Sequence, residues 1–195
     1  MAKRVFFSFH YQDVIDFRAN IVRNHWLTKK DREEAGYFDA SIWETAKKTG
    51  DITLKRLING AFDYTTVTVV LIGTETYQRR WVKYEIMKSL ARGNKIIGVH
   101  INSIPGKDKK VKQLGLNPFN YLGVKYSDDG KKLFVYELSK SNQWIVYTDL
   151  EGWTLDKQIS KNLWGKFLKL SNLCLVYDWV KNEGYNNFAT WVSSS

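Results

Sequence analysis

The sequence predicts an α/β fold in which a parallel sheet carries helices on both faces. Over the first 101 residues, four apolar or β-branched segments alternate with three segments of helical hydrophobic spacing. The apolar segments largely lack the polar alternation of strands with one wet face, which is typical of parallel strands buried on both sides. Strands that alternate with helices are joined by right-handed crossovers, so we expect a flavodoxin-like sheet.

The individual elements are read from apolar runs and helical repeats. Thr66–Ile72 is β-branched or aliphatic throughout, so we place it at the centre of the sheet. In Gln78–Ala91 an apolar residue recurs at every fourth position, which predicts a helix with one buried stripe. The expected order is strand Arg4–Phe9, helix Asp13–Trp26 with Asp13 as its cap, strand Tyr37–Ile42, helix Asp51–Asn59, strand Thr66–Ile72, helix Gln78–Ala91 and strand Lys95–Ile101.

The alternation of strands and helices weakens after Pro105. Leu133–Leu138 and Trp144–Thr148 indicate an antiparallel hairpin, and a short helix is expected to hold three apolar residues near the end of the chain. Two segments, Tyr121–Lys125 and Leu173–Trp179, compete for the place of the fifth strand. We assign residues 1–125 to the core and residues 126–195 to a hairpin and helical elaboration that completes the same domain. The residues of the terminal helix are Phe188, Trp191 and Val192.

Composition narrows the classes of partner and compartment. The formal net charge of +10 favours partners that carry phosphates, although basic residues spread over a solvated surface explain it equally well. Only Lys107–Lys112 and Lys29–Arg32 form local basic clusters. The single cysteine, Cys174, leaves no internal disulfide and lies in an apolar stretch, where we expect a buried structural thiol. The sequence shows neither a signal-peptide pattern nor an apolar run long enough to span a bilayer. We therefore expect a cytoplasmic protein that does not enter a membrane.

Ligands bind parallel sheets at the edge where strand C-termini meet helix N-termini. This rule selects three stretches: Ser8–Asp13, Asp39–Ser41 and Gly73–Glu85. In the last of these, Trp81 and Glu85 are four residues apart, so they share one helix face at the margin of the buried stripe. For both Trp81 and Glu85, a purely structural role remains the alternative to a role in ligand binding or catalysis. Glu85 would then pair with Lys88 or Ser89, and Trp81 would only pack in the core.

Four motifs together resemble a known family. The segment VFFSFHYQD (residues 5–13) resembles the first conserved box of TIR domains, and WVKYEI (residues 81–86) resembles the stretch in which a Trp precedes the catalytic Glu by four residues. With Asn117-Pro118-Phe119 and the terminal YDWVKNEGYNNFATWV (residues 177–192), the chain is similar to the bacterial TIR-like group of the Thoeris anti-phage defence system. The resemblance covers residues 1–101 well and the remainder loosely.

The resemblance implies an enzyme that cleaves the nicotinamide–ribose bond of NAD, by hydrolysis or by closing a cyclic ADP-ribose. Glu85 would be the catalytic carboxylate, and NAD would be the substrate, with no further cofactor and no metal. The functional partner would be a separate effector that senses the nucleotide product, and a phage component would be the trigger. Whether the chain forms a homo-oligomer stays open. The residues expected around the substrate are Ser8, Phe9, His10, Tyr11, Asp39, Gly73 and Trp81.

Two departures from the family pattern limit this transfer. Arg79 stands where many TIR domains have a small or hydroxyl residue, which would alter phosphate contacts or close part of the pocket. The proline-bearing loop of signalling TIR domains is absent between Ser41 and Asp51. The absence of this loop puts the usual receptor–adaptor interaction surface in doubt. The alternative function is a non-catalytic TIR interaction or adaptor module. A receiver or nucleic-acid-binding domain is the weaker one, because neither a phosphorylatable Asp nor a nucleic-acid-binding motif is present.

Overall fold

The computed structural model describes residues 3–38 and 40–193. Within these residues, no helix is both long enough and apolar enough to cross a bilayer. The strands are β1 (Lys3–Phe9), β2 (Arg32–Ala35), β3 (Val67–Ile72), β4 (Lys95–His100), β5 (Leu122–Tyr126), β6 (Lys132–Leu138), β7 (Trp144–Val146), β8 (Trp153–Thr154), β9 (Phe167–Lys169) and β10 (Leu175–Asp178). The helices are α1 (Tyr11–Ile15), α2 (Arg18–Leu27), α3 (Ala40–Thr49), α4 (Asp51–Ala61), α5 (Arg80–Ala91) and α6 (Gly184–Ser193), with short 3-10 turns at η1 (Thr76–Gln78), η2 (Pro118–Tyr121), η3 (Lys161–Leu163) and η4 (Leu170–Asn172).

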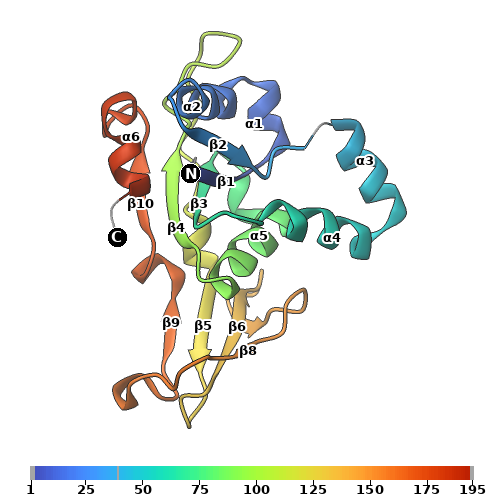
Figure 1. Cartoon of the computed structure of the whole chain (residues 1–195), viewed down its shortest axis with the longest axis vertical. Helices are drawn as coiled ribbons and strands as arrows, with labels where there is room; N and C mark the ends of the chain where they lie inside the picture. Colours follow the sequence, from blue (N-terminus) through green and yellow to red (C-terminus); the bar gives the residue numbers. More distant parts are fainter. Residues whose placement is uncertain (1–2, 39, 194–195) are drawn as a thin grey trace.

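A five-stranded parallel sheet forms the centre of the described molecule (Figure 1). Its order is β10-β4-β3-β1-β2, and every neighbouring pair is parallel. If β10 is counted as the fifth strand, this is the flavodoxin-like order 2-1-3-4-5, which reverses direction between β1 and β3. The predicted fold class is therefore confirmed.

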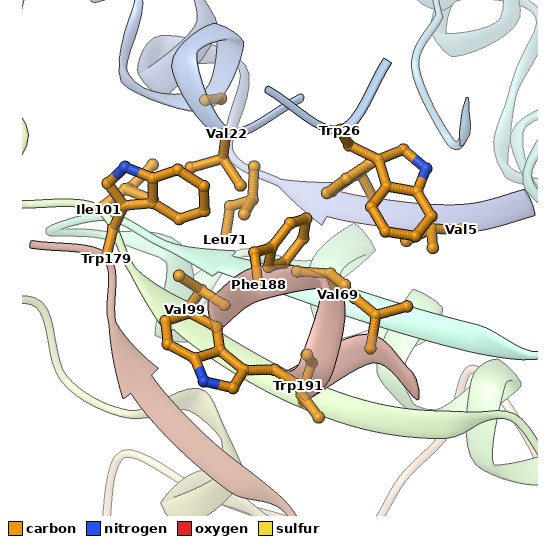
Figure 2. Close-up of a cluster of buried hydrophobic side chains, with 14 of the residues drawn as sticks. Val5, Val22, Trp26, Val69, Leu71, Val99, Ile101, Trp179, Phe188 and Trp191 are labelled. Carbon is orange, nitrogen blue, oxygen red and sulfur yellow. The ribbon is translucent and has the colours of Figure 1, made fainter. Parts of the chain in front are cut away.

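One face of the parallel sheet is covered by α1, α2 and α6. Side chains of β1, β3 and β4 pack there against aromatic residues of α2 and α6 (Figure 2). Trp26 comes from α2, Phe188 and Trp191 come from α6, and all three are buried. This aromatic core fixes the C-terminal helix against the strands that begin the chain. The residues labelled in Figure 2 are Val5, Val22, Trp26, Val69, Leu71, Val99, Ile101, Trp179, Phe188 and Trp191.

The other face is covered by α4, α5 and a second, antiparallel sheet. That sheet has the order β7-β6-β5-β9, with β8 paired to β6. Val82 and Ile86 of α5 lie between strand β3 and the apolar side of β5 and β6. In Figure 1 the antiparallel sheet lies below the parallel one, while α6 and the α3–α4 pair lie on opposite sides. Helix α5 is thus held on both of its sides, which matters because it carries the residues of the site.

The structure settles the fifth strand of the parallel sheet. It is β10, in the predicted segment Leu173–Trp179, and it pairs with β4 from Leu175↔Ile97 to Asp178↔His100. The competing segment Tyr121–Lys125 forms β5 of the antiparallel sheet instead. The predicted hairpin is confirmed as β6 and β7, and the terminal helix as α6. The boundary at residue 125 stays a prediction.

The expected strand Tyr37–Ile42 is wrong. The second strand is Arg32–Ala35, paired with β1 from Lys3↔Arg32 to Phe6↔Ala35, and helix α3 begins at Ala40. A polar strand is stable here because β2 is the edge of the sheet, where burial on both faces is not needed. Its Glu34 accepts hydrogen bonds from Arg23 of α2 at 2.8 and 2.5 Å.

The expected single helix Asp13–Trp26 is two helices. The chain breaks at Phe17, whose φ of 64° lies in the left-handed region and ends α1 before α2 begins. Asp13 is not the cap, because the N-terminal flanking residue of α1 is His10. Helical spacing continues across the break, so the hydrophobic pattern alone could not reveal it.

Candidate active site

A cavity of about 410 Å³ opens beside the C-terminal end of β1. It lies between the loops that follow β1 and β2 and the N-terminal half of α5, next to the point where the strand order reverses. Open α/β sheets bind their ligands at this place. The lining residues are Phe9, His10, Tyr11, Gly36, Phe38, Lys47, Arg79, Arg80, Trp81, Val82 and Glu85.

Glu85 is the buried carboxylate of this cavity. Its side chain is 5% exposed, and the fully buried Ser8 hydroxyl donates a hydrogen bond to its Oε2 at 2.5 Å. Ser8 belongs to β1 and Glu85 to α5, so the contact joins the sheet to the helix that follows β3. The alternative pairing with Lys88 or Ser89 is wrong for the carboxylate, since Ser89 donates to the backbone carbonyl of Glu85 at 2.7 Å.

Burial controls the protonation of this carboxyl group. It raises the pKa of Glu85 to about 8, while the hydrogen bond from Ser8 acts in the opposite direction. Near pH 7 the free protein therefore holds Glu85 mainly as the neutral acid. Burial of the carboxyl group in this way costs stability at high pH, because the ionised form is disfavoured.

Replacement of Ser8 by alanine should move the pH dependence of Glu85 upward. Loss of the donated hydrogen bond disfavours the ionised form, so the alkaline rise in activity should begin at a higher pH than in the wild type. The measurement is the pH profile of kcat/KM for nicotinamide release. Ser8→Thr, which keeps the hydroxyl, should have the same midpoint of the pH profile as the wild type. Identical profiles for Ser8→Ala and the wild type would contradict the claim that Ser8 favours the ionised form of Glu85.

Aromatic side chains form one wall of the cavity. Phe9 and Tyr11 come from the end of β1 and the start of α1, and Trp81 comes from the first turn of α5. Trp81 lies edge-on to Tyr84, with ring centroids 5.9 Å apart, and the Arg80 guanidinium lies 4.8 Å from the Trp81 ring. Trp81 thus both lines the cavity and packs against a buried cluster, so the two roles considered for it coexist.

Replacement of Trp81 by alanine should weaken substrate binding more than it weakens the fold. The indole is only partly buried, and a planar wall of this kind stacks on a flat heterocycle, an interaction of roughly 1–3 kcal/mol. We expect KM to rise about 10-fold, and Trp81→Phe to recover most of the loss. Steady-state kinetics of both variants test this, and an unchanged KM in Trp81→Ala would remove the residue from the binding wall.

Basic side chains also line this cavity. Arg79, Arg80 and Lys47 line it, and Arg80 is fixed by hydrogen bonds of 2.7 Å to both carboxylate oxygens of Asp149. Burial and the nearby Arg79 and Lys112 lower the pKa of His10 to about 4. The imidazole is therefore neutral at physiological pH. Both arginines are paired with carboxylates, Arg79 with Glu75 and Arg80 with Asp51 and Asp149.

The structure brings together most of the predicted site residues. Phe9, His10, Tyr11, Trp81 and Glu85 line one cavity, and Ser8 reaches it through the Glu85 carboxylate. Asp39 lies outside the described residues.

Gly73 is outside the lining of this cavity. A Cβ atom at this position would come within 2.2–2.5 Å of the Asp13 carboxyl group. Gly73 therefore makes room for Asp13.

Sequence reasoning missed five of the lining residues: Gly36, Phe38, Lys47, Arg80 and Val82. The misplaced second strand explains the first two, because Gly36 directly follows the true β2 and Phe38 follows Gly36. Gly36 has a φ of 82°, and a Cβ there would lie 2.4 Å from the Phe7 carbonyl oxygen. Correct placement of β2 would have put this glycine at the ligand edge of the sheet.

The described residues support neither a nucleophilic cysteine nor a metal site. Burial raises the pKa of Cys174 to about 12, so its thiol stays protonated and is a poor nucleophile. Across the described ranges, no group of three or more His, Cys, Asp or Glu side chains is arranged to hold a metal ion.

A flavodoxin-like sheet with a buried glutamate four residues after a cavity-lining tryptophan is the arrangement that the resemblance to TIR domains predicts. Comparison with known proteins agrees, since residues 6–105 match the family described as "Thoeris protein ThsB, TIR-like domain". The chain is also 58% identical over 193 residues to "Putative cyclic ADP-D-ribose synthase ThsB1" of Bacillus cereus (strain MSX-D12), across 99% of this chain and 100% of the relative. The chain belongs to the TIR-like family of the Thoeris protein ThsB.

Proposed function

We propose that this chain cleaves the nicotinamide–ribose bond of NAD and closes the remaining ADP-ribose into a cyclic product. The name of the Bacillus cereus relative, which this chain matches over its full length, supports this class of reaction. The product would signal to a separate effector in anti-phage defence, after a phage component has activated the enzyme in the cytoplasm. The family match to a Thoeris protein supports this biological role.

The observation that carries the proposal is the buried Glu85 carboxyl group in the wall of an aromatic cavity. Nicotinamide in NAD is a cationic leaving group that departs neutral, so breaking its bond to ribose needs little help from an acid. A single carboxylate is then sufficient. It holds the ribose hydroxyls and stabilises the positive charge that develops on the sugar in the transition state.

Substrate binding would also ionise Glu85. A positive charge beside a carboxyl group lowers its pKa, and the nicotinamide ring brings that charge into the cavity. The neutral acid of the free protein would thus become the carboxylate of the complex. The pH profile of kcat/KM should report the raised pKa near 8 of the free protein, whereas the profile of kcat should report a lower value.

Ring closure requires that an internal hydroxyl group reach the sugar before water does. The aromatic side chains of Phe9, Tyr11 and Trp81 reduce the space for water around the reacting carbon. Atoms balance without a further reactant: one ribose hydroxyl oxygen bonds to the anomeric carbon, its proton leaves to a base, and nicotinamide departs with the bonding electron pair. The product has the mass of ADP-ribose less one water.

The test is to incubate the purified chain with NAD, with and without extract of phage-infected cells, and to separate the products. We expect nicotinamide release in the presence of the extract, accompanied by a product of the cyclic mass. An enzyme that consumes a vital cofactor should be inactive at rest, so silence without extract is compatible with the proposal. Absence of nicotinamide under every trigger would contradict it.

A further inference from the structure

A second cavity, of about 640 Å³, lies next to the first. Its size is within the range that holds small ligands. His10 and Arg79 line both cavities, so the two share a wall. The residues that line the second cavity are His10, Gln12, Asp13, Thr74, Glu75, Arg79, Lys112 and Gln113. Apart from His10 and Arg79, none of them belongs to the first cavity.

Asp13 is the buried polar group of this second cavity. Its side chain is 3% exposed, and its Oδ2 atom has no hydrogen-bond partner among the described residues. Burial raises the pKa of Asp13 to about 6, while the nearby charge of Lys112 acts in the opposite direction. A buried acceptor left without a donor costs about 1–3 kcal/mol. A ligand with hydroxyl groups would supply those donors.

The packing around Asp13 shows that the position is built for a carboxyl group. Gly73 lies against the carboxylate, and any larger residue there would collide with it. The backbone N–H of Asp13 donates to the carbonyl oxygen of His10 at 2.9 Å, which fixes the first turn of α1. Asp13 is therefore held at the cavity by the ends of both β1 and β3.

Two cations complete the wall. Lys112 and Arg79 both line the cavity, and each also forms an ion pair, Lys112 with Asp16 and Arg79 with Glu75. The Arg79 Nε atom is buried without a partner among the described residues, so it keeps a free donor. Arginine and lysine beside an open space are the usual partners of phosphate groups. The basic cluster Lys107–Lys112 of the sequence thus contributes one member, Lys112, to a cavity.

The loop that carries Lys112 is held in place by buried side chains. The Lys112 N–H donates to the carbonyl oxygen of Asn102 at 2.9 Å, and the Asn102 amide donates to Gln113 O at 2.8 Å and to Thr74 Oγ1 at 3.1 Å. Arg18, 1% exposed, donates to the carbonyl oxygen of Lys110 at 2.6 Å. The cationic wall is therefore preformed, which lowers the entropy lost on binding.

We propose that the second cavity binds the adenosine ribose–phosphate half of NAD, with the ribose hydroxyls on Asp13 and the phosphates between Arg79 and Lys112. This inference rests on the proposed function and adds to it a second subsite. A ribose offers two neighbouring hydroxyl donors, and an acidic side chain is a common partner for them in nucleotide sites. A phosphate would accept from the unpartnered Arg79 Nε and would share Arg79 and Lys112 with the carboxylates of Glu75 and Asp16.

This placement explains how one substrate can be closed into a ring. A dinucleotide held in two cavities that share a wall is bent at its diphosphate, beside His10 and Arg79. The two riboses are then close to one another before reaction, and such prior positioning accelerates an intramolecular attack.

The test is a binding titration with ADP, which carries the adenosine ribose and the phosphates but has no nicotinamide to release. We expect wild-type protein to bind ADP, and Asp13→Ala and Lys112→Gln each to weaken it by at least about 10-fold. The matched controls are Asp156→Ala and Lys140→Gln at exposed positions, which should bind as the wild type does. Melting curves confirm that each variant is folded.

A second ligand separates a contact from an indirect effect. The 2′,3′-dideoxy form of ADP lacks both hydroxyls, so Asp13→Ala should bind it as weakly as the wild type does. Failure of wild-type protein to bind ADP, or an equal loss for both ligands in Asp13→Ala, would overturn the subsite. Because ADP binding needs no turnover, this outcome is separate from nicotinamide release, whose absence would overturn the proposed function alone.

Discussion

Replacement of Glu85 by glutamine is expected to lower the rate of nicotinamide release by about 10²–10³-fold, the usual cost of removing one electrostatic contact to a transition state. Glutamine has nearly the same shape and can still accept the hydrogen bond from Ser8. It has no negative charge to place beside the cationic sugar, so the loss should fall on kcat rather than on KM. The measurement is steady-state nicotinamide release under the activating condition.

The same substitution should stabilise the fold at alkaline pH. The pKa of Glu85 is raised from 4.5 to about 8 in the folded chain, so folding binds a proton between these values and stability falls as pH rises through them. Glutamine has no proton to lose. We expect Glu85→Gln to melt above the wild type at pH 9 and close to it at pH 4. A variant that is inactive and also less stable at pH 9 would indicate a structural role only.

The control for both measurements is Glu151→Gln, at an exposed glutamate. It replaces the same kind of carboxyl group by the same amide and should alter neither activity nor alkaline stability. Nicotinamide release by Glu85→Gln at the rate of this control would contradict the catalytic assignment.

Replacement of Phe188 by alanine is expected to lower the free energy of unfolding by about 3–5 kcal/mol, as for other fully buried aromatic residues. Phe188 is 1% exposed and lies at the centre of the aromatic core in Figure 2. Its ring centroid is 5.7 Å from Trp26, 5.4 Å from Trp179 and 6.2 Å from Trp191. One substitution therefore removes contacts that join α2, the end of β10 and α6.

Thermal unfolding tests this prediction. A loss of this size corresponds to a melting temperature lower by roughly 6–20 °C in a domain of this length. Asn186→Ala, at an exposed position of the same helix, should shift it by less than about 2 °C. If the two variants melt alike, α6 does not contribute to the core as described.

The parts of the fold that the sequence predicted are those with a strong local signal. β3 is buried along its whole length, and α5 repeats its apolar residues at helical spacing. A short local stretch of sequence is therefore enough to predict each of them. β2 is a polar edge strand whose stability comes from pairing with β1, and no local pattern distinguishes it from a loop. The break at Phe17 likewise depends on a single backbone angle.

In the candidate site, too, local sequence patterns were predictable, whereas contacts between distant segments were not. Trp81 and Glu85 were found because they stand four apart on a helix at the ligand edge, and the TIR resemblance turned that position into a role. Ser8 lies on a distant part of the chain, and its contact with Glu85 could not be predicted because it depends on how α5 packs on β1. Asp13 was expected as a helix cap within the ligand-edge stretch Ser8–Asp13. Its burial against Gly73 could not be predicted, because the space that Gly73 leaves for it exists only in the folded structure.

The most direct test of the central claim is a crystal structure of Glu85→Gln with NAD bound. The account predicts the nicotinamide ring against Phe9 and Trp81, with the hydroxyls of its ribose within hydrogen-bond distance of the residue 85 side chain. NAD bound outside this cavity, or with its nicotinamide end away from residue 85, would contradict the claim that Glu85 acts on the bond to be cleaved.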